Sequence, residues 1–292
     1  MIVFNAIFPV AVIAGIGFIW GKKKPDTNIG WLADIIVYLG SPSLIFSAII
    51  KASFTWKSFA LVFSSAMFAV FIGWLLASLV FQRLLGHKQQ GATLPIIFIN
   101  SGNLGLSLSY FAFGEAGLSI AVIFHTAMFF LVFSLGIFLL TKDEHVWTVF
   151  KYPHLYICVL AILLNFYQLQ VPLAVFRTIE LMGQITIPLM LLLLGIQLSG
   201  CHYGKSWKIA ITGAALRLTA GLLASALFII LFSIEGIMAR VIILLMALPS
   251  AVMTQTLTEK HNKDSELCSS IIAVSTVSSL FYIPILLYLL TK

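Results

Sequence analysis

Apolar segments long enough to cross a lipid bilayer follow one another along the whole chain, with short polar stretches between them. A spanning helix needs roughly 20 apolar residues, and hydropathy predicts ten such spans. In order, they are roughly residues 2–20, 31–50, 58–81, 92–112, 117–140, 154–170, 173–199, 207–232, 237–258 and 266–290. Only 9% of the 292 residues are charged, against about 25% in soluble domains. We therefore predict an all-α integral membrane protein with ten transmembrane helices.

The positive charges of the chain lie in the loops between these spans. Odd-numbered loops hold eleven Lys and Arg residues, whereas even-numbered loops and the termini hold five. The eleven are Lys22, Lys23, Lys24, Arg83, Lys88, Lys142, Lys151, Lys205, Lys208, Lys260 and Lys263. Because cytoplasmic loops carry the excess of Lys and Arg, this predicts a multi-pass protein of the cell (inner) membrane with both termini on the extracytoplasmic side. The net charge of +7 is thus explained by topology, and no nucleic-acid partner is expected.

The first span has no basic residue before it and three lysines after it. This pattern is typical of a spanning helix with its N-terminus outside, and not of a cleaved signal peptide.

The two halves of the chain resemble each other. The tetrapeptide Leu-Leu-Ala-Ser occurs at residues 75–78 and again at 222–225, and Pro42 in span 2 has a counterpart, Pro188, in span 7. We expect both prolines to kink or locally open their spans. Because five spans is an odd number, the second copy is inverted in the membrane. We predict a first repeat at 1–140, a cytoplasmic linker at 141–153 and a second repeat at 154–292.

Spans 4 and 9 are both interrupted near their middles. Span 4 contains Asn-Ser-Gly-Asn-Leu-Gly at residues 100–105, and the repeat offset brings Asn103 onto Ser250, beside Pro249 in span 9. Non-helical backbone at membrane depth is tolerated only where it is buried in protein or lines a cavity. Paired interruptions at equivalent positions are a pointer to a transporter binding site.

Each interrupted span would begin a second half-helix near the membrane midplane. Helix N-termini carry free amide groups and the positive end of the dipole, so they favour an anion. The candidate substrate-binding residues are Asn100, Ser101, Asn103, Ser107, Arg217, Ser250, Thr254 and Gln255. Gly102, Gly105 and Pro249 are interpreted as backbone requirements of the breaks. The alternative is that these polar side chains only satisfy backbone groups that the breaks release.

Arg217 lies near the centre of span 8 and has no carboxylate at matching depth in another span. An arginine there costs at least about 2.5 kcal/mol, so it requires a partner. That partner is either a bound anion or the carbonyl groups at the ends of the first half-helices.

His125 is the histidine inside span 5. It is a candidate for proton coupling, with a structural, hydrogen-bonded histidine as the alternative. Cys158, Cys201 and Cys268 lie far apart, without metal-ligand spacing, and there is no phosphate-binding loop. We therefore predict neither a metal nor a cofactor.

At these residues the chain resembles the auxin efflux carrier family, whose bacterial members are often described as malate or malonate permeases. The resemblance rests on residues 100–115, on residues 187–198 in span 7, on Leu-Pro-Ser-Ala-Val-Met at 248–253 and on Ser275 with Thr276. Ser107 and Ser250 stand where family members often have proline, which allows both hydroxyls to face the substrate. There is no long loop between spans 5 and 6, so the plant hormone exporter itself is not indicated.

The resemblance implies two inverted five-helix repeats in which the broken spans 4 and 9 cross. It also implies a scaffold of spans 1, 2, 6 and 7, a moving transport unit of spans 3–5 and 8–10, and elevator-like exchange of a small organic anion across the bilayer. Family relatives are homodimers joined through the scaffold, at spans 2 and 7.

Three other functions fit the sequence less well. A sodium-coupled symporter of the bile-acid type would need an acidic cation site, and spans 4, 5, 9 and 10 offer hydroxyls, amides and carbonyls instead. An intramembrane enzyme would need a paired acid or base, which the sequence does not indicate. A sensor is disfavoured by the short loops. We predict a transporter and not an enzyme.

Overall fold

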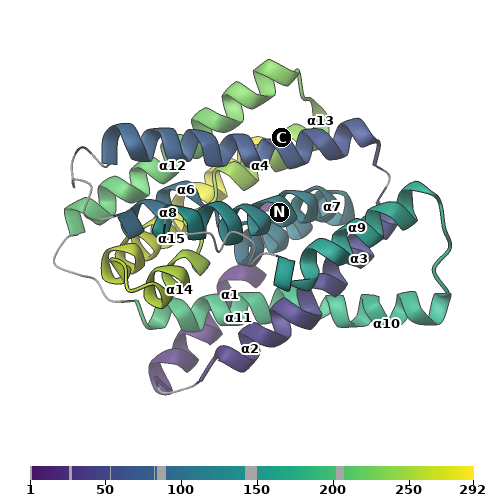
Figure 1. The fold of residues 1–292 in the computed structure, drawn as a ribbon, viewed down its shortest axis with the longest axis horizontal. Helices are drawn as coiled ribbons and strands as arrows, with labels where there is room; N and C mark the ends of the chain where they lie inside the picture. Colours follow the sequence, from purple (N-terminus) through teal and green to yellow (C-terminus); the bar gives the residue numbers. More distant parts are fainter. Residues whose placement is uncertain are drawn as a thin grey trace.

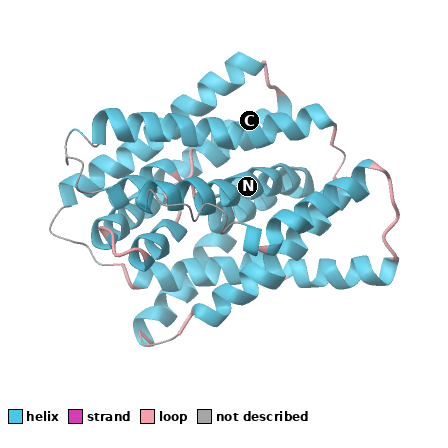
Figure 2. Cartoon of the chain, in the orientation of Figure 1, coloured by secondary structure: helices cyan, strands magenta, loops and turns pink. Residues whose placement is uncertain are grey.

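The computed structural model describes residues 2–25, 28–52, 54–81, 83, 90–141, 150–201 and 207–292. Over these residues the chain forms helices joined by turns and loops, and its β-type pairing is limited to an isolated bridge between Ile99 and Ser250 (Figure 2). Most of the predicted linker at 141–153 lies outside the described residues, as do Lys88, Lys142 and Lys205 of the charge count.

Helices satisfy backbone hydrogen bonds within one segment, which a lipid environment demands. In chain order they are α1 (Ile2–Lys23), α2 (Gly30–Ile35), η1 (Ile36–Gly40), α3 (Ser41–Lys51), α4 (Trp56–Leu76), η2 (Ala77–Phe81), η3 (Gln90–Thr93), α6 (Leu94–Ile97), η4 (Ser101–Leu106), α7 (Ser107–Leu131), η5 (Val132–Gly136), α8 (Ile137–Thr141), α9 (Pro153–Phe166), α10 (Leu173–Gln184), α11 (Thr186–Ser199), α12 (Trp207–Phe232), α13 (Gly236–Met246), α14 (Met253–Lys260) and α15 (Ser265–Thr291).

Seven stretches of the described helices are long and apolar enough to cross a membrane. They are Val3–Lys23, Gly30–Lys51, Trp56–Phe81, Ser101–Thr141, Leu173–Ser199, Trp207–Phe232 and Ser265–Thr291. Two shorter apolar helices, α9 and α13, lie where spans 6 and 9 were predicted. The chain is thus a multi-pass membrane protein.

The longest apolar stretch, Ser101–Thr141, contains a sharp reversal. Gly114 has a φ of +65° and interrupts the helical geometry of α7. Gly102 and His125, which lie on either side of this reversal, are neighbours in space. The stretch therefore folds back on itself at Gly114, between the ranges predicted for spans 4 and 5.

Pro42 and Pro188 each lie just after an irregularity in their helices. The π-helical turn η1 precedes Pro42, and the junction between α10 and α11 at Ile185 precedes Pro188. Each irregularity lies within about one turn of a proline, which cannot donate the hydrogen bond that a continuous helix requires.

The helices pack in two groups. In the first, α1 lies along α11, and α3 packs on α9 and α10; in the second, α12 packs on α4 and α15, while α7 contacts α4 and α13. Gly195 allows α11 to approach the backbone of α1 closely at Ala14 and Phe18. Figure 1 shows α4 and α12 along one side, α10 and α11 along the other, and α7 between them. Both α1 and α3 contact α7, so the two groups meet around it.

Candidate functional site

The two predicted interruptions meet in space. The first falls at Phe98–Asn100, between α6 and η4, and the second at Ala247–Val252, between α13 and α14. The Asn100 amide donates to the Pro249 carbonyl at 2.9 Å, and the Ala251 amide donates to the Phe98 carbonyl at 3.0 Å. These bonds satisfy part of the backbone that each break releases, so each broken helix stabilises the other.

A cavity of about 170 Å³ lies beside this crossing. Both breaks contribute to its wall, and α2, η1, α9 and α11 supply further lining residues. Its polar and backbone-lined positions are Ser41, Asn100, Ser101, Gly102, Asn103, His125, His154, Gln197, Ala251, Val252, Met253 and Thr256. Pockets for drug-sized ligands measure about 300–1,000 Å³, so this cavity suits a smaller molecule.

Five of the predicted site residues line the cavity: Asn100, Ser101, Gly102, Asn103 and His125. The Ser101 hydroxyl lies 3.1 Å from His125 Nδ1, a bond that joins the break to the following helix. A Cβ atom at position 102 would lie 2.9 Å from His125 Cε1, so glycine is needed for this close approach.

Donor groups gather on this wall. Four backbone amides here donate no hydrogen bond within the described chain: those of Gly102, Asn103, Val252 and Met253. They belong to the first turns of the second half-helices, where intrahelical acceptors are missing. Asn100 is 4% exposed, and its Nδ2 has no partner among the described residues. The wall is therefore rich in donors and suited to an anion.

Several predicted side chains satisfy local backbone instead of lining the cavity. The Ser107 hydroxyl donates to the Asn103 and Leu104 carbonyls, and the Thr254 hydroxyl donates to the Ala251 carbonyl. These contacts agree with the alternative given for the polar residues, that their side chains satisfy backbone groups released by the breaks.

The remaining predicted positions lie around the break in span 9. Ser250 is buried outside the cavity wall, with its amide bonded to Ser275 Oγ at 3.2 Å. Gln255 donates to Glu259 at 2.9 Å and lines a neighbouring space. Pro249 and Gly105 act through the backbone. The Pro249 carbonyl accepts the Asn100 amide, and the Cα of Gly105 faces the side chains of Leu245 and Leu248.

Arg217 joins the two broken helices to each other. Its Nη1 donates to the Ile96 and Ile97 carbonyls at 2.9 and 3.2 Å, and its Nη2 donates to the Met246 carbonyl at 3.0 Å. These carbonyls end α6 and α13, where the helix dipole is negative. Arg217 is 1% exposed and is not part of the cavity wall. The sequence left two partners open for Arg217, a bound anion or the carbonyl groups at the ends of the first half-helices. The structure shows the carbonyl groups.

A second space of about 460 Å³ adjoins the cavity and shares Gln197, Val252 and Thr256 with it. Lys22, in the last turn of α1, and Lys24, which follows it, line its wall together with Glu259. An anion moving through this space would pass two positive charges and one negative charge before reaching the crossing.

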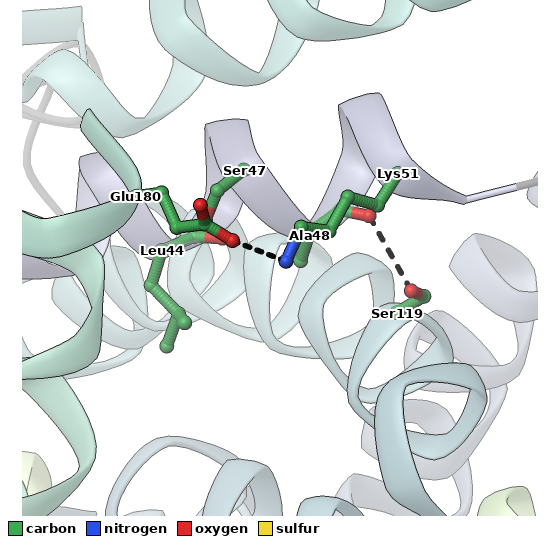
Figure 3. A network of polar contacts seen from close by, with 6 residues as sticks. All are labelled: Leu44, Ser47, Ala48, Lys51, Ser119 and Glu180. Carbon is green, nitrogen blue, oxygen red and sulfur yellow. Dashed lines mark hydrogen bonds and ion pairs between the residues drawn. The ribbon is translucent and has the colours of Figure 1, made fainter. Parts of the chain in front are cut away.

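The two helix groups are also in contact where α7 meets α3. The Ser119 hydroxyl of α7 donates to the Ala48 carbonyl of α3 at 3.3 Å, and nearby, within the first group, Lys51 of α3 forms an ion pair with Glu180 of α10 (Figure 3). A separate space of about 260 Å³ here shares no lining residue with the crossover cavity. The crossover cavity therefore shares lining residues with the space beside Lys22 and none with this one.

Sequence reasoning missed part of the cavity wall. Ser41, His154, Gln197, Met253 and Thr256 were not selected. His154 follows Pro153 at the start of span 6, where a polar residue resembles an ordinary helix end. The burial of His154 is what identifies it as a lining residue. That burial results from the packing of α9 on α3, which hydropathy does not report.

These features together define a multi-pass α-helical transporter with a small cavity at two interrupted helices. The chain belongs to the family described as "Membrane transport protein", which matches residues 2–149 and 144–287 and confirms the resemblance to the auxin efflux carrier family. It is 26% identical to an uncharacterized transporter of Methanocaldococcus jannaschii, over 97% of each chain. It is 27% identical to another of Methanothermobacter thermautotrophicus, over 96% of each chain. The family and both relatives are transporters and not enzymes, as predicted.

Proposed function

We propose that this protein is a secondary carrier for small carboxylate anions such as malonate or malate, bound in the cavity where the two broken helices cross. The observation that carries the proposal is the set of unpaired donors on one cavity wall, namely Asn100 Nδ2 and the first amides of the second half-helices. A buried donor without a partner costs about 1–3 kcal/mol, and a carboxylate oxygen removes that cost.

The helix arrangement supports a carrier of ten spans in two inverted repeats. The first helix group would be the scaffold, formed by spans 1, 2, 6 and 7, and the second would be the moving unit. The cavity lies between them, so displacement of one group along the other would carry the anion across the bilayer. A homodimer joined through α2–α3 and α10–α11 of the scaffold is part of this proposal.

The lysines beside the cavity indicate the side of the membrane to which it opens. Lys22 and Lys24 lie where the distribution of Lys and Arg places the cytoplasm. The described conformation would therefore load or release the anion at the cytoplasmic face, with both termini outside. The contact between Ser119 and Ala48 must break before the opposite side opens.

Flux measurements in proteoliposomes test the function. Radiolabelled malonate and malate should enter vesicles that contain the protein, and an excess of either unlabelled anion should compete. Asn100→Ala should reduce uptake strongly, whereas Asn5→Ala, which alters an exposed asparagine of α1, should not. Running each assay with and without sodium or a pH gradient identifies the coupling ion. Neither flux nor binding for any carboxylate in the panel would refute the proposal.

A further inference from the structure

His154 is a second histidine in the wall of the crossover cavity. It lies in the first turn of α9, in the helix group that does not contain the breaks, and is 2% exposed. Its Nε2 lies 2.9 Å from Ser41 Oγ, and the Phe129 ring stacks on the imidazole with centroids 4.0 Å apart at 12°. The ring is thus held in one plane by two neighbours from different helices.

The other ring nitrogen of His154 is left without a partner. Nδ1 is buried and forms no hydrogen bond within the described chain. In a neutral imidazole, one nitrogen donates and the other accepts. When the Ser41 hydroxyl donates to Nε2, the proton resides on Nδ1, which then needs an acceptor. Protein side chains usually satisfy such a group, because leaving it unpaired costs about 1–3 kcal/mol.

His154 and His125 make similar contacts in the cavity wall. Each bonds a serine hydroxyl through one ring nitrogen, His154 from the first helix group and His125 from the second. Phe129 contacts both rings, with its centroid 6.4 Å from that of His125. No group of three or more His, Cys, Asp or Glu residues in the described chain could hold a metal ion. Both residues are in the lining of the cavity, so a role for the pair is one of hydrogen bonding.

We propose that His154 is a substrate-binding residue on the scaffold side, donating from Nδ1 to the anion that Asn100 and the half-helix amides hold from the other side. This inference rests on the proposed function. Because His154 belongs to the helix group opposite the breaks, the anion would bind both groups at once in this conformation. It would lose His154 when the groups move past each other.

Two substitutions separate this role from a structural one. His154→Asn keeps a polar atom close to the position of Nδ1 but loses the bond to Ser41, whereas His154→Gln keeps an amide near Nε2 and loses Nδ1. Malonate binding to the purified full-length protein should stay within about 3-fold of wild type in His154→Asn. It should weaken at least about 10-fold in His154→Gln, because a hydrogen bond to a charged group is lost.

The melting temperatures of the same proteins without malonate provide the second readout. A purely structural histidine would give the reverse pattern, with His154→Asn less stable and both variants binding malonate like wild type. That pattern would overturn the inference while leaving the carrier proposal intact. If the wild-type protein binds no malonate, the proposed function fails together with this inference.

A measurement on the unsubstituted protein covers the case in which a variant does not fold. In protein labelled with ¹⁵N-histidine, malonate should shift the signals of two of the six histidines, since both His125 and His154 line the cavity. A spectrum in which the His154 signal does not shift would contradict a ligand role for His154.

Discussion

Replacing Arg217 with methionine tests how the two broken helices are held together. The substitution removes three hydrogen bonds, to the carbonyls of Ile96, Ile97 and Met246, at 2.9–3.2 Å. Three buried carbonyls without that partner cost about 1–3 kcal/mol each. Methionine has no charge to bury, so the desolvation cost of the guanidinium, several kcal/mol, is no longer incurred. We expect a net loss of about 3 kcal/mol, or roughly 6–12 °C in melting temperature.

Thermal unfolding in detergent measures this loss. Arg217→Lys should be intermediate, because one ammonium group cannot span carbonyls on both broken helices as the guanidinium fork does. Arg240→Met, which changes an exposed arginine of α13, should melt close to wild type. If Arg217→Met melts like wild type but no longer binds malonate, Arg217 is the counter-ion of the substrate and our reasoning is wrong.

Three further changes follow from individual contacts. Gly102→Val should weaken malonate binding at least about 10-fold in a titration, because even a Cβ atom would lie 2.9 Å from His125; unchanged affinity would show that the cavity does not hold the anion. Asn165→Ala should lower the unfolding free energy by about 1–3 kcal/mol, since its Nδ2 donates to three carbonyls at the end of α3 at 2.9–3.1 Å; a melting temperature equal to wild type would contradict this. Lys51→Gln should cost no more than about 1 kcal/mol at low salt and less at high salt, because the side chains of Lys51 and Glu180 are 39% and 27% exposed; a salt-independent loss would refute that estimate.

The helix breaks could be predicted from sequence because they use residues that are unfavourable in lipid. Asn100, Gly102 and Pro249 stand out against an apolar background, and the backbone there must be satisfied by protein. The repeat offset then indicated that the two breaks are equivalent. Their direct pairing in the structure, through Ile99 and Ser250, follows the same logic.

The direction of individual side chains could not be predicted. Periodicity does not distinguish a hydroxyl that faces a cavity from one that bonds its own helix, as Ser107 and Thr254 do. The contact of Arg217 with helix ends depends on how α12 packs against two distant segments. His154 was missed because its burial arises from tertiary packing of α9 on α3.

Locating the bound anion tests the central claim most directly. Bromomalonate is a heavy-atom analogue of malonate, so anomalous diffraction from crystals grown with it reveals where the anion lies. We predict a bromine peak inside the crossover cavity, between Asn100 and His154, that excess malonate abolishes. A peak beside Arg217 or at any site outside this cavity, or no peak at a concentration that saturates binding in solution, would contradict the account.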